Sequence, residues 1–291
     1  MRVFVTGIRG FLGSRLAERL RARGHDVAGS TSIPHTGHAH LRLAEPVPAG
    51  MFGDADIVIH CAHDMARGSL ARNVEGHKRL HSEARPRRQI YISSYSARPD
   101  AASEYGMAKY QAEQFFLASG EAVVRPGLVI GNGGLFGRTL ARIERASFIP
   151  LVHGGRYAAP VVALADVCHG LIALVEGAAE PGRAWNLATT QTPSARELVE
   201  AVCAATGRRP VLLPVPYWLA SASLAIAESL RLTLPVSRES LRGVARSVEG
   251  VHTSHLMELI GRETNLEQMI RAALCERQPR RGERRPPGMK C

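Results

Sequence analysis

The sequence is poor in lysine, in regularly spaced cysteine and in long apolar runs. Only three of its 37 basic residues are lysine, so arginine supplies nearly all of the positive charge. The five cysteines are scattered and form no CxxC pair, which argues against a disulfide framework or zinc knuckle and for a reducing compartment. No run approaches the roughly 18 apolar residues that span a bilayer, and the first residues, MRVFVTG, lack the pattern of a signal peptide. We therefore expect a cytoplasmic protein without a membrane partner.

The formal net charge of +11 raises the question of a nucleic-acid partner. Residues 276–291 carry six basic and two acidic side chains among prolines and glycines, a composition that predicts a basic disordered tail. Other positive charges recur in patterns such as RLAERLRARG, which are typical of solvated helix faces. The charge is therefore better explained as a compositional bias, and we expect a small-molecule substrate rather than nucleic acid.

Short apolar strands alternate with amphipathic helices along residues 1–130. Residues 55–62, ADIVIHCA, are nearly all apolar, as in parallel strands that are buried on both faces. The alternation predicts an α/β fold with a Rossmann-like doubly wound parallel sheet.

Three glycines in the stretch TGIRGFLG lie between the first predicted strand and the first predicted helix. Gly7 permits a tight turn, Gly10 lets the backbone approach a pyrophosphate, and Gly13 lets the helix pack close to the strand. Phe11 and Leu12 begin the helix, whose free N–H groups and positive dipole end attract phosphate. The stretch therefore predicts a dinucleotide-binding loop.

Because the chain has 291 residues, at about 150 per domain, we expect two domains and a tail. A dinucleotide-binding domain is predicted at 1–165, with a further core strand from 183–188. A smaller, mainly helical substrate lobe is predicted at 166–275, before the basic tail.

The second strand ends in neutral residues, Ser30, Thr31 and Ser32. NAD sites usually place a carboxylate there for the ribose 2′-hydroxyl, and a carboxylate would repel the 2′-phosphate of NADP. Arg9 precedes the second glycine of the loop, and a guanidinium matches phosphate geometry. These residues favour NADP as cofactor, with NAD as the alternative.

Tyr105 and Lys109 are four residues apart on one predicted helix, so they share a face. Lysine beside a tyrosine is expected to lower the phenol pKa from its usual value near 10, so that Tyr105 can exchange a proton with a substrate oxygen. Ser94, at the end of the fourth strand, can hydrogen-bond the same oxygen. Ser94, Tyr105 and Lys109 are therefore the predicted catalytic residues.

With these motifs the chain resembles the extended short-chain dehydrogenase/reductase family, in its NAD-dependent epimerase/dehydratase group. The resemblance covers roughly residues 1–210. The motifs that carry it are TGIRGFLG, ADIVIHCA, NVEG, YISS, YGMAK, VVRPGLVIG, ALADVCHGLIALVE and WNLA followed by SARELVEAV.

The resemblance implies that His60, Cys61 and Ala62 line the cofactor near its ribose, and that the backbone around Pro126 lies near the nicotinamide. It also implies a homodimer through the helices near 68–84 and 103–119. The stretch SSYS lacks the Asp-Glu pair of the 4,6-dehydratases, so dehydration is not expected.

We thus predict an NAD(P)-dependent oxidoreductase that transfers hydride to or from a secondary alcohol or ketone, with a sugar nucleotide as one substrate class. An NAD-retaining sugar-nucleotide epimerase and a non-catalytic NADP sensor are the alternatives. The histidines of HTGHAH, residues 35–40, suggest metal at first sight, but no fourth ligand pattern accompanies them, and we predict no metal site.

Overall fold

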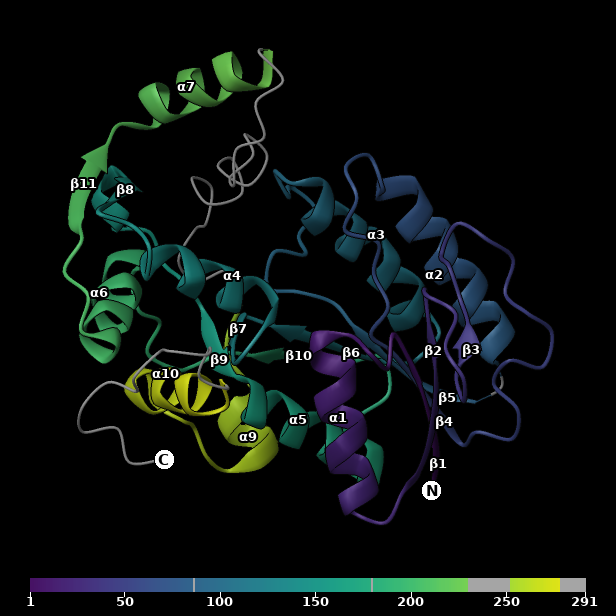
Figure 1. Cartoon of the computed structure of the whole chain (residues 1–291). Helices are drawn as coiled ribbons and strands as arrows, with labels where there is room; N and C mark the ends of the chain where they lie inside the picture. Colours follow the sequence, from purple (N-terminus) through teal and green to yellow (C-terminus); the bar gives the residue numbers. More distant parts are fainter. Residues whose placement is uncertain (86, 179, 230–251, 278–291) are drawn as a thin grey trace. The chain divides into compact units, whose positions relative to one another are not determined.

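The computed structural model describes residues 1–85, 87–178, 180–229 and 252–277 (Figure 1). The contacts divide the chain into two compact units. The first unit comprises Met1–Pro126, Ala165–Leu187 and Ser254–Gly261, and the second comprises Gly127–Leu164, Ala188–Thr253 and Arg262–Cys291.

The first unit is built on a seven-stranded parallel sheet with the strand order β10-β6-β5-β4-β1-β2-β3. Its strands are β1 (Arg2–Thr6), β2 (Asp26–Thr31), β3 (Ala39–His40), β4 (Ile57–His60), β5 (Arg88–Ile92), β6 (Ala122–Pro126) and β10 (Ala184–Leu187). This is the Rossmann-like doubly wound sheet that the strand and helix alternation predicts. Because the strands are parallel, their carboxyl ends lie along one edge of the sheet, and the predicted site residues follow the strands at this edge.

Helices cover both faces of this sheet (Figure 1). Helices α1 (Phe11–Ala22) and α5 (Leu164–Ala173) lie on one face, and α2 (Leu70–Ala84) and α3 (Glu104–Ala118) on the other. A five-residue π-helical segment, Leu174–Ala178, follows α5, and the short α9 (Leu256–Ile260) also belongs to this unit.

Local signals set where two of these helices begin and end. The Ser103 side chain accepts a hydrogen bond from Gly106 N at 3.0 Å and thereby caps the N-terminus of α3. Gly24 adopts φ +82° directly after α1, a left-handed conformation that glycine adopts without steric cost at a helix C-terminus.

Among the residues that the structure describes, the second unit contains two small parallel pairs of strands and four helices. Its strands are β7 (Leu128–Ile130), which pairs with β9 (Val161–Ala163), and β8 (Phe148–Val152), which pairs with β11 (Val211–Val215). Its helices are α4 (Gly134–Ile143), α6 (Ala195–Thr206), α7 (Tyr217–Ser229) and α10 (Leu266–Cys275), with a short 3₁₀ turn at His153–Gly155. Side chains from α4, α6, α10 and β9 form a separate apolar core.

This division differs from the predicted domains in two segments. Residues 127–164 belong to the second unit, although they fall in the predicted first domain, whereas residues 165–182 belong to the first unit. The reason is that α5 packs its buried face against the first sheet, with Val167 and Leu171 fully buried. Of the predicted tail, residues 278–291 lie outside the described residues, and Arg277 pairs with Glu144 of the second unit at 2.5 Å.

Cys61, Cys168 and Cys203 are free thiols. None of the helices within the described ranges is long and apolar enough to cross a membrane.

Candidate active site

The glycine loop between β1 and α1 is packed so closely against its neighbours that its three glycine positions have no room for a side chain. Gly10 N donates to Gly7 O at 2.8 Å. A Cβ on Gly13 would stand 2.4 Å from Gly7 O, and one on Gly7, at φ +67°, would meet the backbone of Ala62 at 3.1 Å. Gly10 is the N-cap of α1 and caps it with no side chain, so the first N–H groups of the helix remain for an anion. Phe11 and Leu12, half-buried, form its first turn, and this cradle fits the pyrophosphate of a dinucleotide.

The end of β2 lies beside this loop because Ile8 N donates to Ser30 O at 3.0 Å. Arg9, the next residue, is exposed. Ser30 is fully buried and Thr31 is nearly so, whereas Ser32 is exposed. The structure therefore brings Arg9 to the strand end that lacks a carboxylate, but it points the Ser30 hydroxyl into the protein.

The segment that follows β4 lies beside the glycine loop, with Ala62 N donating to the Thr6 hydroxyl at 3.1 Å. The His60 side chain is fully buried and bonds Gln89 through Nε2 at 2.9 Å. Burial lowers the pKa of His60 to about 3 and raises that of Cys61 to about 12. His60 is thus a neutral core residue, and its side chain does not line the edge of the sheet where the cofactor was expected. Cys61 remains a protonated thiol and is not a nucleophile.

Ser94, Tyr105 and Lys109 meet at the carboxyl end of β5. The Ser94 and Tyr105 side chains share a hydrogen bond, and Ser94 Oγ lies 2.9 Å from Ser96 Oγ. Gly106 makes this approach possible, because a Cβ there would stand 2.5 Å from Ser96 O. On the adjacent strand, Pro126 O accepts from Tyr95 N at 3.0 Å, so the end of β6 flanks the same place.

Lys109 is buried behind the tyrosine. Its Nζ donates to Ile92 O at 2.6 Å and lies 5.0 Å from the centre of the Tyr91 ring and 6.0 Å from that of Tyr105. Burial lowers the pKa of Lys109 to about 8, while Cys61 and Glu113 act in the opposite direction.

The pKa of Tyr105 corrects one expectation from the sequence. It is raised rather than lowered, because desolvation of the hydroxyl outweighs the opposing hydrogen bond with Ser94, although the Tyr105 side chain as a whole is 36% exposed. In this structure Tyr105 is therefore a protonated phenol at neutral pH, suited to donate a proton.

A family model described as the NAD-dependent epimerase/dehydratase family matches residues 3–188, more than half of the chain. The chain belongs to the NAD-dependent epimerase/dehydratase family. The resemblance stated from the motifs is thereby confirmed.

Relatives of this family member include a ketoreductase of Stigmatella aurantiaca, the 4-hydroxy-2-methyl-3-oxo-4-farnesyl-3,4-dihydroquinoline-1-oxide ketoreductase. It is 27% identical over 281 residues, which cover 82% of this chain and 83% of the relative. Among solved structures, RMD from Pseudomonas aeruginosa complexed with NADPH has a TM-score of 0.67 at 22% identity, covering 94% of this chain and 99% of that one. UDP-glucose 4-epimerase from Thermotoga maritima with UDP-glucose has a TM-score of 0.69 at 18% identity, covering 94% and 97%. At these identities the structures show the shared fold.

Sequence reasoning missed a buried ion pair beside the predicted catalytic residues of this family member. Glu113 is fully buried on α3 and accepts from Arg125 of β6 at 3.0 Å (Nε) and 2.5 Å (second nitrogen). It also accepts from the Ser93 hydroxyl at 2.6 Å. The signal was present, since Tyr105, Lys109 and Glu113 recur every four residues on one face of the helix.

Two histidines were also missed as neighbours of the site. The His63 ring meets the Tyr105 ring edge to face at a centroid distance of 5.0 Å, and the His77 ring packs on Tyr91 at 4.9 Å. Burial, with a contribution from Lys109, lowers the pKa of His63 to about 2, so His63 stays neutral. Within the residues that the structure describes, no three His, Cys, Asp or Glu side chains are arranged to hold a metal ion.

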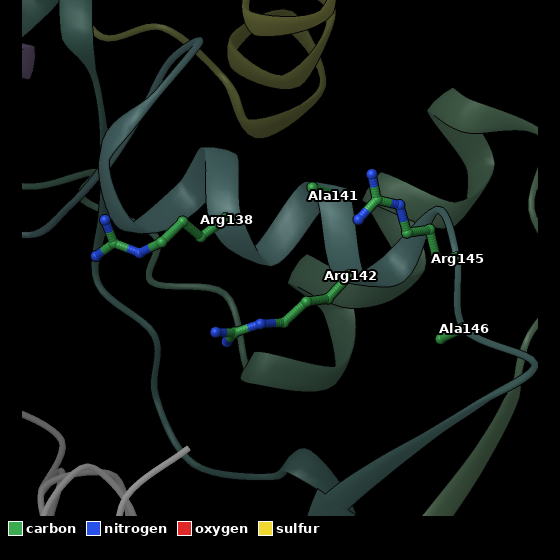
Figure 2. Close-up of a pocket in the computed structure, with 5 residues that line it drawn as sticks. All are labelled: Arg138, Ala141, Arg142, Arg145 and Ala146. Atoms are coloured by element: carbon green, nitrogen blue, oxygen red, sulfur yellow. The ribbon is translucent and has the colours of Figure 1, made fainter. Parts of the chain in front are cut away.

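A shallow cavity of about 440 Å³ lies along α4 in the second unit (Figure 2). It is lined by Arg138, Ala141, Arg142, Arg145 and Ala146. The guanidinium groups of Arg138 and Arg145 end at separate places along α4 (Figure 2), so they do not converge on one anion. The cavity contains none of the catalytic residues and is not the candidate active site.

We expect Gly13→Ala to abolish dinucleotide binding. The new methyl group would stand 2.4 Å from Gly7 O, so the glycine loop must open. Titration with NADPH, with thermal unfolding as a parallel measurement, tests this. Gly137→Ala in α4 is the matched control, because its Cβ has 3.9 Å of clearance, and alanine there is expected to keep binding and add up to about 1 kcal/mol of helix stability. Unchanged binding in Gly13→Ala would contradict the cradle.

We expect Glu113→Gln to destabilise the protein by about 3–5 kcal/mol, because breaking a buried ion pair leaves one charge uncompensated. Urea unfolding followed by circular dichroism measures this. Replacing both partners, Glu113→Leu with Arg125→Met, is expected to cost less than the single change, since no unpaired charge remains. Equal losses in the single and the double variant would refute this account.

Proposed function

We propose that this protein is an NADP-dependent reductase that converts a ketone to a secondary alcohol. The observation that carries the proposal is the meeting of three side chains at the carboxyl end of β5: Tyr105 hydrogen-bonds Ser94, and Lys109 Nζ lies 6.0 Å from the centre of the Tyr105 ring. A phenol that is protonated at neutral pH is the form that reduction needs, because the carbonyl oxygen must gain a proton as hydride arrives.

Each of the three catalytic residues has a separate task in this proposal. Ser94 and Tyr105 hydrogen-bond the substrate oxygen and hold the carbonyl for attack. Tyr105 donates its proton to that oxygen. The buried ammonium of Lys109 favours the negative charge that is then left on the phenol. When bound, the reduced nicotinamide supplies the hydride, so that a ketone, a hydride and a proton give the alcohol.

The glycine cradle supports a dinucleotide, and the second strand supports the choice of NADP. Arg9 lies next to the end of β2, through the bond of Ile8 N to Ser30 O. Within the described ranges no carboxylate pairs with Arg9. A phosphate beside this guanidinium would gain a charge-assisted hydrogen bond.

The substrate class follows from the same relative that supports reduction. The Stigmatella aurantiaca relative is named as a ketoreductase of a farnesylated dihydroquinoline oxide, so a ketone is the group that we propose for this chain. A sugar nucleotide, as in the Thermotoga maritima complex, is a second source of such a group. An NAD-retaining epimerase can be distinguished from a reductase, because it returns the hydride to its substrate and oxidises no NADPH overall.

We expect Tyr105→Phe to lower kcat for ketone reduction by about 10²–10⁴-fold, the usual contribution of a general acid, with an unchanged Kd for NADPH. Oxidation of NADPH with a panel of ketones, followed at 340 nm, measures the rate, and cofactor fluorescence measures Kd. Tyr110→Phe, on the same helix but outside the row of Tyr105 and Lys109, is the matched control. Full activity in Tyr105→Phe would favour the sensor alternative, and sugar epimerisation without NADPH oxidation would favour the epimerase.

The rate of reduction is expected to fall as the pH rises through about 8, because that is where Lys109 loses its proton. Below this pH the ammonium is charged and supports the phenolate that Tyr105 leaves behind. The measurement is kcat/KM from pH 6 to pH 10. In Lys109→Arg, which stays charged over this range, the alkaline decline is expected to disappear. A wild-type profile that is flat to pH 9.5 would contradict the role of Lys109.

A further inference from the structure

The histidine-rich segment HTGHAH, residues 35–40, folds back onto the end of β2. Residues Ser30 and Thr31 pair with Ala39 and His40 as the short strand β3. The His40 ring bonds Ser32 O through Nε2 at 3.2 Å. These contacts place His35, His38 and His40 at the carboxyl end of β2, which is the strand end that lacks a carboxylate.

Arg9 of the glycine loop follows a residue that contacts this strand end. The bond from Ile8 N to Ser30 O, 3.0 Å long, fixes the residue before Arg9 against the end of β2. The charge of Arg9 is close enough to His38 to lower its pKa, as is that of Arg21 from α1. Arg42, whose Nε donates to Ser32 O at 3.4 Å, adds a further positive charge on the other side.

The rings of His35 and His38 stack with their centres 5.4 Å apart and 27° between their planes. His35 Nδ1 donates to Thr36 O at 2.8 Å, so its Nε2 remains to bind another group. His38 Nδ1 is buried without a hydrogen-bond partner among the described residues. A cavity of about 560 Å³ is lined by Pro34, His35, Thr36, His38 and His40.

The groups that face His38 are all basic: His35 from its own loop, Arg21 from α1 and Arg9 from the glycine loop. Together with burial they lower the pKa of His38, so the ring is neutral near pH 7 while no anion is present. The charges of Arg9 and Arg21 disfavour protonation of His38, and a bound dianion would favour it. Arg42 is already paired with the Glu45 carboxylate at 3.6 Å.

We propose that His35, His38 and Arg9 form the binding site for the 2′-phosphate of NADP, and that phosphate binding is coupled to protonation of His38. The proposal rests on the proposed function, because NAD has a hydroxyl at that place. The histidines of HTGHAH, for which no metal site is predicted, are thus proposed to bind a phosphate. NADPH affinity should therefore rise as the pH falls, whereas NADH affinity should not.

Fluorescence titrations of the full chain with NADPH and with NADH, from pH 5.5 to pH 8.5, test this without any substrate. We expect NADPH to bind about tenfold more tightly at pH 6 than at pH 8, or about 1.4 kcal/mol, and NADH affinity to change less than twofold. His38→Asn keeps a polar side chain that cannot be protonated, and should lose the rise. His153→Asn is the matched control, since His153 lies in the second unit at φ +48°, a conformation that asparagine tolerates.

The phosphate itself also titrates near pH 6, which weakens binding at low pH. Protonation of the phosphate weakens binding equally in every variant. The ratio of the wild-type to the His38→Asn affinity at each pH therefore reports the contribution of His38 alone. Calorimetry in two buffers of different ionisation enthalpy should show proton uptake with NADPH and none with NADH.

The outcomes separate this proposal from the proposed function. Preference for NADPH with the same pH dependence in wild type and His38→Asn would overturn the role of the histidines and leave NADP as cofactor. Equal or tighter binding of NADH at every pH would overturn the choice of NADP and this proposal with it. A pH-dependent ratio together with proton uptake would support both.

Discussion

The buried ion pair of Glu113 and Arg125 is the interaction on which the geometry of the candidate active site depends. It ties α3 to β6, and the Ser93 hydroxyl ties the same carboxylate to the end of β5. Lys109 and Tyr105 lie one and two turns before Glu113 on this helix, while Ser94 follows Ser93 directly. The distance between the serine and the tyrosine is therefore set by a carboxylate that takes no part in the chemistry.

A buried pair has a strongly directional geometry, whereas apolar packing alone would let α3 slide along the sheet. The Arg125 guanidinium uses two of its nitrogens on Glu113, which fixes orientation as well as distance. Lys109 shares this environment, since the charge of Glu113 partly offsets the effect of burial on its pKa. One acidic residue thus supports both the position and the charge of the catalytic lysine.

Close backbone approach is the second constraint, and it explains the glycines better than flexibility does. Gly13 lets α1 pack against the turn at Gly7, and Gly106 lets α3 pack against Ser96. Both glycines stand where a helix begins beside a strand end, so the helix N-termini face the edge of the sheet that carries the site. The glycine loop, which holds Arg9, and the histidine segment that follows β2 lie along this same edge.

Most strands of the large sheet could be predicted because each is a short apolar run between turn residues, as in residues 57–60; the two-residue β3 was not predicted. The meeting of Ser94, Tyr105 and Lys109 could be predicted because a strand end and a four-residue helical spacing bring them together. The strands at 128–130, 148–152 and 211–215 were not predicted, since they are short or half exposed, and Phe148 and Val211 are both 60% exposed. The boundary between the units was also missed, because α5 is assigned by the sheet on which it packs rather than by its place in the chain.

The sequence by itself determined the Rossmann-like sheet, the glycine loop, the Ser94, Tyr105 and Lys109 set and the family, because these depend on residue type and spacing. The tertiary structure decided the protonation states and partners. Tyr105 has a raised pKa, His60 is a buried core residue, and Glu113 meets Arg125, which lies on a different strand. Burial and long-range contact decide such properties, and neither can be obtained from spacing, since the free energy of a charge depends on the solvent and the groups that surround it in space.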